Sequence, residues 1–243
     1  MPNPTAAMLV IGDEILSGRT RDANMHHLAG RLSQVGIDLK EVRVVSDDAG
    51  AIIAATRALA GAYAHVFTSG GIGPTHDDIT ADCVAEAMGA AIDVREDARA
   101  LLQAHYDRQG SDLNAARLRM ARIPDGARLI DNPVSVAPGF SLENVHVMAG
   151  VPKIFQAMLE SLLPSLTGGA PLATQSLPVH LPEGDIAGPL GDIAAAFPDL
   201  SFGSYPFNQA GVLGANVVVR GPDAAALADA MTALRAAFQG HLG

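Results

Sequence analysis

The sequence predicts an α/β protein in which a mostly parallel sheet is covered by helices on both faces, followed by a small α+β domain. Short apolar runs alternate with segments of helical periodicity over residues 6–163. Beyond a stretch rich in Gly, Pro, Ser and Thr at residues 163–176, the pattern reads strand, helix, strand, strand, helix. Of the 243 residues, 49% are hydrophobic and 17% are charged, so the chain can bury a sizeable core.

The first predicted elements are two strands with a helix between them. Residues 6–12 (AAMLVIG) form a short apolar run that ends in glycine, which is typical of a buried parallel strand. The segment DLKEVRVVS at residues 38–46 predicts the second strand. The helix between them is expected to end at Gly36. Its apolar face consists of Met25, Leu28, Ala29, Leu32 and Val35.

The alternation continues through the rest of the larger domain, to which we assign residues 1–168. A second helix leads into the strand AHVFTSGG at residues 64–71. Thr80 is the predicted cap of the next helix, and Gly89 is its predicted end. The remaining elements predicted for this domain are a polar helix at 96–109, a strand at 145–150 and a helix that begins at Pro152.

Residues 172–243 are predicted to form the small βαββα domain. Its expected elements are strands at 177–181, 200–207 and 214–221 and helices at 185–197 and 223–238. The segment GPLG at residues 188–191 has the GxxG spacing of nucleic-acid-binding KH modules. This domain has six acidic residues and only two basic ones, Arg220 and Arg235, so we expect no nucleic acid to bind there.

Composition and charge exclude several classes of partner. With 26 acidic and 16 basic residues, the formal net charge is −10, which argues against nucleic acid and against an anionic membrane surface. No apolar run approaches the ~20 residues that span a bilayer, and the N-terminal segment lacks the features of a signal peptide. The single cysteine, Cys83, permits no internal disulfide and is expected to be a small buried side chain rather than a catalytic thiol. We therefore expect a cytoplasmic protein.

The segment TSGGIGPTHDDIT, at the end of the third predicted strand, combines glycines with two adjacent carboxylates. Gly70, Gly71 and Gly73 allow a turn whose successive N–H groups suit an anion. Asp77 and Asp78 precede a predicted helix N-terminus, where a divalent cation can bridge carboxylate and phosphate. The alternative is an ordinary strand–turn–helix connection in which an aspartate caps the helix.

Two further acidic pairs follow predicted strands. Asp13 and Glu14 come after the first strand, and Asp47 and Asp48 come after the second. Because the carboxyl ends of parallel strands meet at one edge of a sheet, we expect these pairs to converge with the aspartates after the third strand. Their mutual repulsion would be costly without a cation or a shared proton. Taken singly, each pair would suit a solvated or helix-capping role.

Five ordered motifs resemble a known family. They are IGDEILSGRTRDAN (11–24), VVSDD (44–48), TSGGIGPTHDDIT (68–80), NPVSVAPGF (132–140) and AGVPKIFQAML (149–159). Together they resemble the MoaB/Mog-type molybdopterin-binding domain and, more closely, the amino-terminal part of competence/damage-inducible protein A (CinA). The distal residues look like the small second domain of CinA-type proteins, so the resemblance covers nearly the whole chain.

The resemblance implies a three-layer α/β/α domain whose pocket receives a pterin or a nucleotide carrying phosphate. Asp47 and Asp78 occupy the positions of the family's catalytic aspartates. With Asp77, they are the expected ligands of a divalent metal ion, namely Mg²⁺, Mn²⁺ or Co²⁺. The residues expected to bind phosphate or nucleotide are Gly12, Asp13, Glu14, Ser69, Gly70, Gly71, Gly73, Pro74, Thr80, Ser135, Gly150 and Lys153.

Two functions are compatible with the resemblance. In the first, the protein is a metal-assisted hydrolase of a nucleotide pyrophosphate such as ADP-ribose, as are some CinA-type proteins. In the second, it is a module that binds molybdopterin or a nucleotide without turnover. The resemblance also implies a homo-oligomer, either a dimer or a trimer, whose ligand is a small nucleotide or pterin.

Other polar side chains are weaker candidates. Asn24 and Arg19 follow the first strand and suit ligand contact or a surface or capping role equally well. His76, beside the aspartates, is a candidate phosphate contact. A cluster of three arginines suits either a phosphate in a neighbouring subunit or a salt-bridged helix face; its members are Arg117, Arg119 and Arg122.

Overall fold

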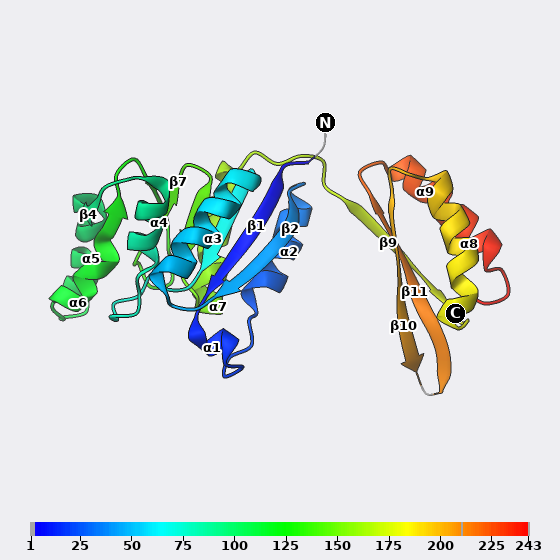
Figure 1. Cartoon of the computed structure of the whole chain (residues 1–243), viewed down its shortest axis with the longest axis horizontal. Helices are drawn as coiled ribbons and strands as arrows, with labels where there is room; N and C mark the ends of the chain where they lie inside the picture. The colour runs from blue at the N-terminus through cyan, green and yellow to red at the C-terminus, as the bar shows by residue number, and fades with distance from the viewer. Residues whose placement is uncertain (1–2, 210, 243) are drawn as a thin grey trace. The chain divides into compact units, whose positions relative to one another are not determined.

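The computed structural model describes residues 3–209 and 211–242. The chain divides into two compact units, Met1–Gly169 and Ala170–Gly243 (Figure 1). The first unit has two hydrophobic cores and the second has one.

A six-stranded sheet forms the centre of the first unit. Its strands in chain order are β1 (Thr5–Ile11), β2 (Asp38–Val45), β3 (His65–Ser69), β6 (Arg128–Ile130), β7 (Gly139–Leu142) and β8 (Val145–Met148). They are arranged in the order β2-β1-β3-β8-β7-β6. The first four strands of this order are parallel, whereas β7 pairs antiparallel with both β8 and β6. The prediction of a mostly parallel sheet is confirmed.

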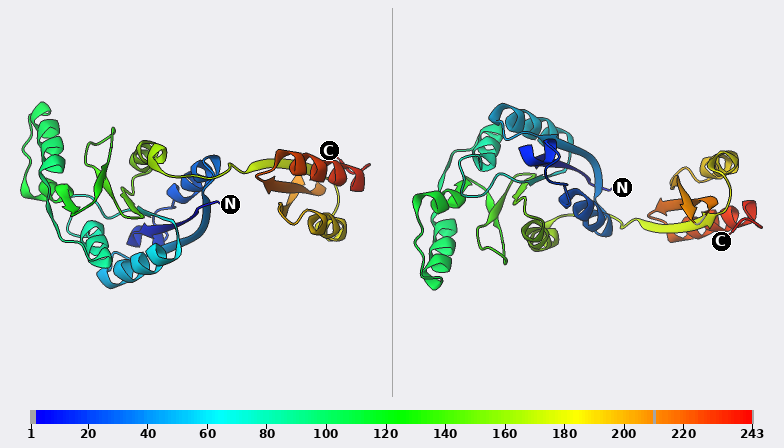
Figure 2. Two further views of the ribbon diagram at one scale, coloured as in Figure 1. Left: turned by 90° about the horizontal axis from the view of Figure 1, so that it is seen from above. Right: turned by 90° about the horizontal axis from the view of Figure 1, so that it is seen from below.

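Helices cover both faces of this sheet. They are α2 (Asn24–Gln34), α3 (Ala49–Ala62), α4 (Thr80–Met88) and α7 (Pro152–Leu162). Figure 2 shows α2 and α7 on one side of the sheet and α3 on the other, and α4 packs against α3. The three-layer α/β/α arrangement is therefore confirmed.

Strand β1 explains why both faces are covered. Its side chains from Ala6 to Ile11 are at most 3% exposed. Alternate side chains such as Leu9 belong to the core beneath α3 and α4. Those between them, such as Met8, belong to the core beneath α2 and α7. A strand buried on both faces requires a continuous apolar run, which is the pattern that the sequence has here.

Local signals set most of the helix boundaries. Gly36 and Gly89 follow α2 and α4 with positive φ, as expected for residues that end helices. Asp48 caps α3 by accepting an amide N–H of its first turn at 2.9 Å. The prediction that Thr80 caps α4 is wrong, because Ile79 is the N-cap and the Thr80 hydroxyl bonds elsewhere. Within the described ranges, no helix is long and apolar enough to cross a membrane.

A smaller layer between α4 and β6 completes the first unit. This α5–α6 arm, residues 92–124, consists of β4 (Ile92–Val94), α5 (Glu96–Arg108), α6 (Ala115–Leu118), the 3₁₀ helix η1 (Arg119–Ala121) and β5 (Arg122–Pro124). The sequence predicts its long helix but not the antiparallel pair of β4 and β5. Strands of three residues are too short to display a period of two.

The second unit is a three-stranded antiparallel sheet packed against two helices. Its elements are β9 (Ala173–Val179), α8 (Glu183–Ala196), β10 (Ser201–Gln209), β11 (Val212–Gly221) and α9 (Ala224–Ala237). The strand order is β10-β11-β9, and both helices share one core with β9 and β11. The predicted βαββα order is confirmed.

Two predictions for the second half of the chain need correction. The linker expected at residues 163–176 contains the 3₁₀ helix η2 (Leu163–Ser165) and the first residues of β9. That part of β9 was missed because its residues are exposed and lack apolar alternation. The segment GPLG lies within α8, so it is not a loop able to clamp nucleic acid.

The order of the larger sheet marks out one edge as the place where a ligand site is expected. Strand β1 lies between β2 and β3, so the chain leaves β1 toward one neighbour and returns through β3 on the other side. Such a reversal opens a crevice beyond the carboxyl ends of the two strands, where ligands of α/β proteins bind. The motifs GDE and TSGGIGP stand at these two strand ends.

Candidate functional site

The loops that follow β1, β3 and β8 contact one another through their main chains. The amide of Gly70 donates to the carbonyl of Met148 at 3.2 Å. A Cβ added at Gly70 would lie 2.2 Å from the carbonyl oxygen of Ile11. A Cβ added at Gly150 would lie 3.2 Å from the Cα of Gly70. The absence of side chains at Gly70 and Gly150 thus lets the three strand ends meet.

The turn at Gly71 is held by Thr80, the first residue of α4. Gly71 has a φ of 67°, and a Cβ there would lie 2.1 Å from the Thr80 Oγ1. The Thr80 hydroxyl donates to the carbonyl of Gly70, and its amide donates to the carbonyl of Gly71, both at 3.0 Å. Because Thr80 is fully buried, it fixes the loop and does not present its hydroxyl to a ligand, contrary to the prediction.

Three successive amides in this loop have no acceptor. In the part of the chain that the structure describes, no hydrogen bond uses the N–H of Gly71, Ile72 or Gly73. Consecutive unpaired amides in a turn create an electropositive surface suited to an anion. All three residues line one cavity. The loop therefore has free donors for the oxygens of a phosphate.

A cavity of about 570 Å³ opens at these strand ends. Its volume is in the range of sites that bind nucleotide-sized ligands. The lining combines carboxylates and glycine-rich main chain with apolar side chains such as Met120 and Ile154. The lining residues are Ile11, Gly12, Glu14, Thr20, Asp47, Gly70, Gly71, Ile72, Gly73, Pro74, Asp77, Asp78, Met120, Asn132, Ser135, Ala137, Ala149, Gly150, Val151, Pro152 and Ile154.

Each of the three acidic pairs contributes to this cavity. In two of the pairs, one member does not line the cavity and instead lies at a helix start. Asp13 begins the short helix α1 (Asp13–Leu16), and Asp48 caps α3. Within the described residues, the cavity has no basic lining side chain. Its carboxylates therefore repel one another and any phosphate that arrives without a cation. The acidic lining residues are Glu14, Asp47, Asp77 and Asp78.

Hydrogen bonds hold two of these carboxylates in place. Asp47 accepts the amide N–H of Asp13 on Oδ2 at 2.9 Å. Asp78 accepts the amide of Thr75 on Oδ2 at 2.8 Å, and the Thr75 hydroxyl donates to the same oxygen. In each carboxylate only Oδ2 takes part in these bonds, so Oδ1 is left for a cation or a water molecule.

The loop before β7 is organised by Asn132, which is 3% exposed. Its amide group donates to the Ser135 hydroxyl at 2.7 Å and to the carbonyl of Ala137 at 2.8 Å. Its carbonyl oxygen accepts the amides of Val134 and Ser135, both at 3.1 Å. Asn132 therefore has no capacity left for a ligand, whereas Ser135 keeps a hydroxyl proton to donate.

Asn24 connects two of the strand-end loops. Its Nδ2 donates to the Ser69 hydroxyl and to the carbonyl of Gly150, both at 2.7 Å. Asn24 and Ser69 are each 3% exposed. They therefore position the loop at Gly150 and are covered from a ligand.

Four of the predicted binding residues, and the weaker candidate His76, lie outside the cavity lining. Ser69 and Thr80 are buried in the hydrogen bonds described above, and Asp13 offers only its main chain to Asp47. Lys153 is exposed on α7, and the side chain of His76 is 99% exposed. The predicted residues that do line the cavity are Gly12, Glu14, Asp47, Gly70, Gly71, Gly73, Pro74, Asp77, Asp78, Ser135 and Gly150.

The apolar part of the lining and the role of Asn132 are not among the features that the sequence predicts. Asn132 opens the motif NPVSVAPGF, and an Asn before Pro is a turn signal that could have singled it out. Met120 reaches the cavity because the α5–α6 arm folds back toward the glycine loop. No local pattern announces such a contact between distant segments.

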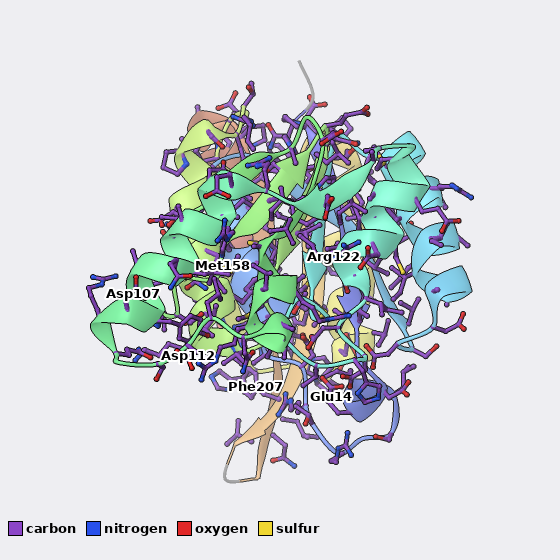
Figure 3. All side chains as sticks on the ribbon, turned by 90° about the vertical axis from the view of Figure 1, so that its left-hand side faces the viewer. Glu14, Asp107, Asp112, Arg122, Met158 and Phe207 are labelled. Carbon is purple, nitrogen blue, oxygen red and sulfur yellow. The ribbon has the colours of Figure 1, made fainter. Side chains whose placement is uncertain are left out.

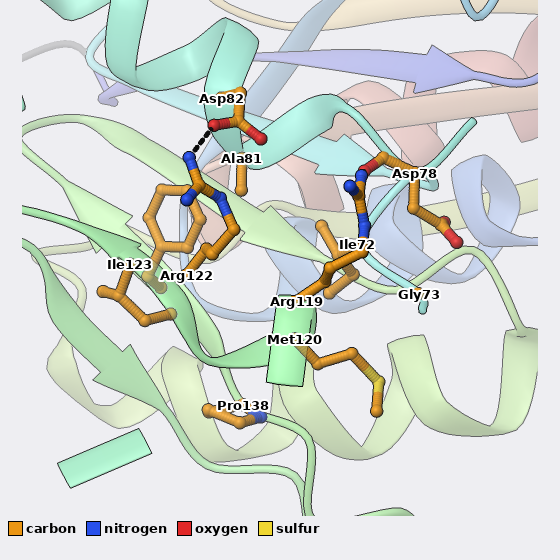
Figure 4. A pocket seen from close by; sticks show the side chains of 12 residues that line it. Ile72, Gly73, Asp78, Ala81, Asp82, Arg119, Met120, Arg122, Ile123 and Pro138 are labelled. Atoms are coloured by element: carbon orange, nitrogen blue, oxygen red, sulfur yellow. Dashed lines mark hydrogen bonds and ion pairs between the residues drawn. The ribbon is translucent and has the colours of Figure 1, made fainter. Parts of the chain in front are cut away.

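Two arginines of the cluster lie beside the glycine loop, as Figure 4 shows. Arg122 is paired with the carboxylate of Asp82, which raises the pKa of Arg122 further above its ordinary value. Arg119 donates from Nη2 to the main-chain carbonyl of Asp78 at 3.1 Å. Of the two, Arg122 has an ion-pair partner, whereas Arg119 donates to a neutral oxygen.

The third arginine, Arg117, lies away from the cavity in the α5–α6 arm. Its guanidinium is 4.3 Å from the centroid of the Tyr106 ring, and it donates to the carbonyl of Asp112. Figure 3 shows Asp107 and Asp112 at the outer edge of this arm. Arg117 therefore has a structural role within the arm.

The single thiol is buried against α3. Cys83 is 4% exposed, and burial raises its pKa to about 11. The thiol is consequently protonated at neutral pH and is a poor nucleophile. This environment fits the small buried side chain that the sequence predicts.

The expected metal ligands do not form a complete protein-only site. Within residues 3–209 and 211–242, no group of three or more His, Cys, Asp or Glu side chains is arranged to hold a metal ion. Mg²⁺, however, is usually held by one or two carboxylates together with water and substrate phosphates. The donors fit a cation of this kind, because Asp47 and Asp78 both line the cavity and each has a free oxygen.

Comparison with known proteins yields a match for each unit. Residues 7–168 match the family described as probable molybdopterin binding domain. Residues 171–242 match the family described as the middle domain of FAD synthase. The two matches divide the chain at nearly the same place as the two compact units.

Curated relatives of this chain are longer than the chain itself. A probable FAD synthase of Caenorhabditis elegans is 32% identical over 263 residues, which cover 98% of this chain and 50% of the relative. A CinA-like protein of Citrifermentans bemidjiense is 37% identical over 205 residues, with coverages of 82% and 48%. The chain thus spans about half the length of these relatives.

A solved structure shares the fold of the first unit. The CinA protein of Thermoplasma acidophilum, described as of unknown function, matches with a TM-score of 0.62 and 35% identity. The match covers 67% of this chain and 97% of that protein. Because a family match extends over residues 7–168 and CinA-like proteins are among its relatives, this chain belongs to the family of the probable molybdopterin binding domain.

Proposed function

We propose that this protein is a metal-assisted hydrolase that cleaves the pyrophosphate of a nucleotide such as ADP-ribose. The observation that carries the proposal is the loop from Gly71 to Gly73, whose three amides have no acceptor among the described residues. They line a cavity that also holds four carboxylates. Donors for phosphate oxygens and acceptors for a cation thus share one site, as hydrolysis of a phosphoanhydride requires.

Asp47 and Asp78 are the residues that would hold the divalent cation, with Asp77 beside them on the cavity wall. Bound Mg²⁺, Mn²⁺ or Co²⁺ would offset the negative charge on the phosphoryl oxygens and so favour attack of water on the phosphorus. The need for a cation follows from charge, because four acidic side chains otherwise face an anionic ligand.

The chain's own groups would orient the reactants. The loop amides would bind the nonbridging oxygens and stabilise the charge that builds up as water adds to phosphorus. A free carboxylate oxygen of Asp47 or Asp78 would accept a proton of that water and align it. The bond from phosphorus to the bridging oxygen breaks, so that ADP-ribose and one water give AMP and ribose 5-phosphate.

The apolar part of the lining would receive the base of the nucleotide. Ile72, Met120 and Ile154 offer aliphatic and thioether surface for a flat ring. Ser135 offers a hydroxyl donor for a polar edge of that ring. Such a combination would accept either an adenine or a pterin. The polar groups of the ring would determine which of the two binds better.

The names of the relatives support a ligand of this class. FAD synthase, whose middle domain matches residues 171–242, is named for a dinucleotide that contains a pyrophosphate. The family matched by the first unit is named for molybdopterin. A phosphate attached to a flat heterocycle is the chemistry common to both names.

Incubation of the purified protein with ADP-ribose, FAD or NADH and each of the three metals tests the proposal. We expect release of AMP in at least one combination. Asp78→Asn and Asp47→Asn should each lower the rate by more than ~10-fold, because general-base or metal-ligand roles contribute at least that much. Asp112→Asn, in the α5–α6 arm and outside the cavity, is the matched control and should keep the wild-type rate.

Two results would count against the proposal. If no combination of nucleotide and metal releases AMP, the protein is not a hydrolase of this class. If Asp78→Asn retains the wild-type rate, hydrolysis takes place elsewhere and the assignment of the site is wrong.

A second candidate function is binding of molybdopterin or a nucleotide without turnover. The family matched by residues 7–168, which is described as a probable molybdopterin binding domain, favours it. A ligand that binds only the folded protein raises its melting temperature. Competition between molybdopterin and ADP-ribose in a thermal-shift assay, combined with no release of AMP, is the result expected of such a module.

A further inference from the structure

A second, smaller cavity of about 20 Å³ is lined in part by the glycine loop (Figure 4). The lining residues common to both cavities are Gly71, Ile72, Gly73, Asp78 and Met120, so the glycine loop borders both. A space of this size accommodates a single oxygen-sized group and not a ring. Arg119 lines it.

The guanidinium of Arg119 has unused donors. Its Nη2 donates to the main-chain carbonyl of Asp78 at 3.1 Å, which is a neutral acceptor. Its Nε is buried and has no partner among the described residues. A buried N–H without an acceptor costs free energy, and an oxygen that enters with a ligand would recover it.

Other charges near the loop are already paired or are negative. Arg122, on the opposite wall of the small cavity, is neutralised by Asp82. The main cavity has no basic lining side chain in the described part of the chain. Within the described ranges, Arg119 is therefore the basic side chain beside the loop that has no carboxylate partner.

We propose that Arg119 binds a second phosphoryl group of the ligand, so that the site prefers a diphosphate to a monophosphate. The amides from Gly71 to Gly73 would hold one phosphoryl group, and the guanidinium would hold an oxygen atom of the next one where the two linings meet. Guanidinium groups suit phosphate oxygens in charge and in shape. The inference rests on the phosphate-binding part of the proposed function, and it places Arg119 in the site of its own subunit rather than in a neighbour's.

Titration of the full chain with methylenediphosphonate and Mg²⁺ tests this inference. The analogue cannot be hydrolysed, and inorganic phosphate serves as the comparison ligand. We expect Arg119→Gln to weaken methylenediphosphonate binding by roughly 10- to 100-fold, the range for a lost hydrogen bond between charged groups. Binding of inorganic phosphate should change far less, so that the preference for the diphosphate narrows. Arg119→Lys should lose less than Arg119→Gln, because the charge remains.

Arg117→Gln is the matched control, because it removes the same charge from a neighbouring residue outside both cavities. It should bind both ligands as the wild type does. Isothermal titration calorimetry provides the dissociation constants, and thermal unfolding shows whether each variant is folded.

Three outcomes would overturn the inference. One is methylenediphosphonate affinity in Arg119→Gln within about twofold of wild type. Another is an equal loss for both ligands, which would mean that Arg119 merely supports the carbonyl of Asp78. The third is failure of the wild type to bind methylenediphosphonate. The binding assay involves no catalysed step, so the two proposals can fail separately. Binding that depends on Arg119, without release of AMP, would support this inference and reject the hydrolase. Release of AMP without such binding would support the hydrolase and reject this inference.

Discussion

Gly71 occupies a position that an alanine cannot take without moving the loop. Its φ is positive, and its missing Cβ would lie 2.1 Å from the Thr80 Oγ1. We predict that Gly71→Ala lowers the free energy of unfolding by more than about 2 kcal/mol, from backbone strain and displacement of a buried hydroxyl. Urea unfolding followed by circular dichroism provides the measurement.

The control for this substitution is Gly30→Ala in α2. A Cβ at Gly30 would meet nothing within 4 Å, and alanine favours a helix interior by about 1 kcal/mol over glycine. Gly30→Ala should therefore be neutral or stabilising. Equal destabilisation of the two variants would contradict the structure of the loop.

Asp47 and Asp48 are adjacent, yet the structure assigns them different tasks. Asp48 caps α3, whereas Asp47 lines the cavity. Asp48→Ala should lower the free energy of unfolding by about 1 kcal/mol through loss of the cap, with methylenediphosphonate binding unchanged. Asp47→Ala should weaken Mg²⁺-dependent binding and have the smaller effect on stability. Urea unfolding and calorimetry on both variants check the pair, and identical profiles would refute the distinction.

The acidic residues of the candidate site could be predicted from the sequence. Which of them line the cavity and which cap helices could not. Gly71, Asp47 and Asp78 stand in motifs whose chemistry is local, so their placement at the strand ends could be anticipated. Thr80 is predicted to contact the ligand because the family resemblance places a binding threonine at this position. Its hydroxyl turns instead to the carbonyl of Gly70, a contact between residues ten positions apart that depends on the path of the loop.

Strands β3 and β8 carry two neighbouring histidines, of which His146 is buried and His65 is half-buried. His65 Nδ1 and His146 Nε2 lie 3.2 Å apart, and the Ser141 hydroxyl lies 2.9 Å from His146 Nδ1. Burial lowers the pKa of His146 to about 3 and also lowers the pKa of His65. The ring pair is consequently neutral in the folded protein at neutral pH.

This pair predicts a loss of stability in mild acid. As the pH falls below about 6.5, His146 becomes protonated in the unfolded chain but stays neutral in the folded chain. The free energy of unfolding should therefore fall by about 1.4 kcal/mol per pH unit because of His146. The loss should extend toward the folded pKa of about 3. Urea unfolding between pH 7 and 5 measures the slope, before most carboxylates titrate.

His146→Gln should flatten this slope even if it lowers stability throughout. His76→Gln is the control, because its side chain is 99% exposed and it should retain the wild-type slope. A slope that is unchanged in His146→Gln would show that other groups cause the acid sensitivity.

Long, periodic elements were predictable from the sequence, and short ones were not. The helix α2 is predicted by apolar residues that recur with a period of 3.6 residues, and the strand β1 is predicted by a continuous apolar run. The antiparallel strands β6 and β7 have three and four residues. Their pairing depends on how the chain returns from the α5–α6 arm. This is a tertiary contact, and a local stretch of sequence does not predict it.

The two units have separate cores, and every residue that lines the main cavity belongs to the first unit. The CinA protein of Thermoplasma acidophilum matches over 97% of its own length with only 67% of this chain. We predict that a chain of residues 1–169 folds and binds methylenediphosphonate with Mg²⁺ within about twofold of the full chain. Calorimetric titration of both chains checks this. A much weaker affinity in the shorter chain would show that the second unit contributes to the site.

The main-chain contact of Gly70 with Gly150 has a consequence for how such a site changes through descent. In the proposed function the phosphate donors are backbone amides, so substitution of other side chains would leave them in place. The lining side chains Met120 and Ile154 could change without moving the glycine loop, and such changes would alter which heterocycle is accepted. One backbone cradle would thus suit relatives named for FAD as well as relatives named for molybdopterin.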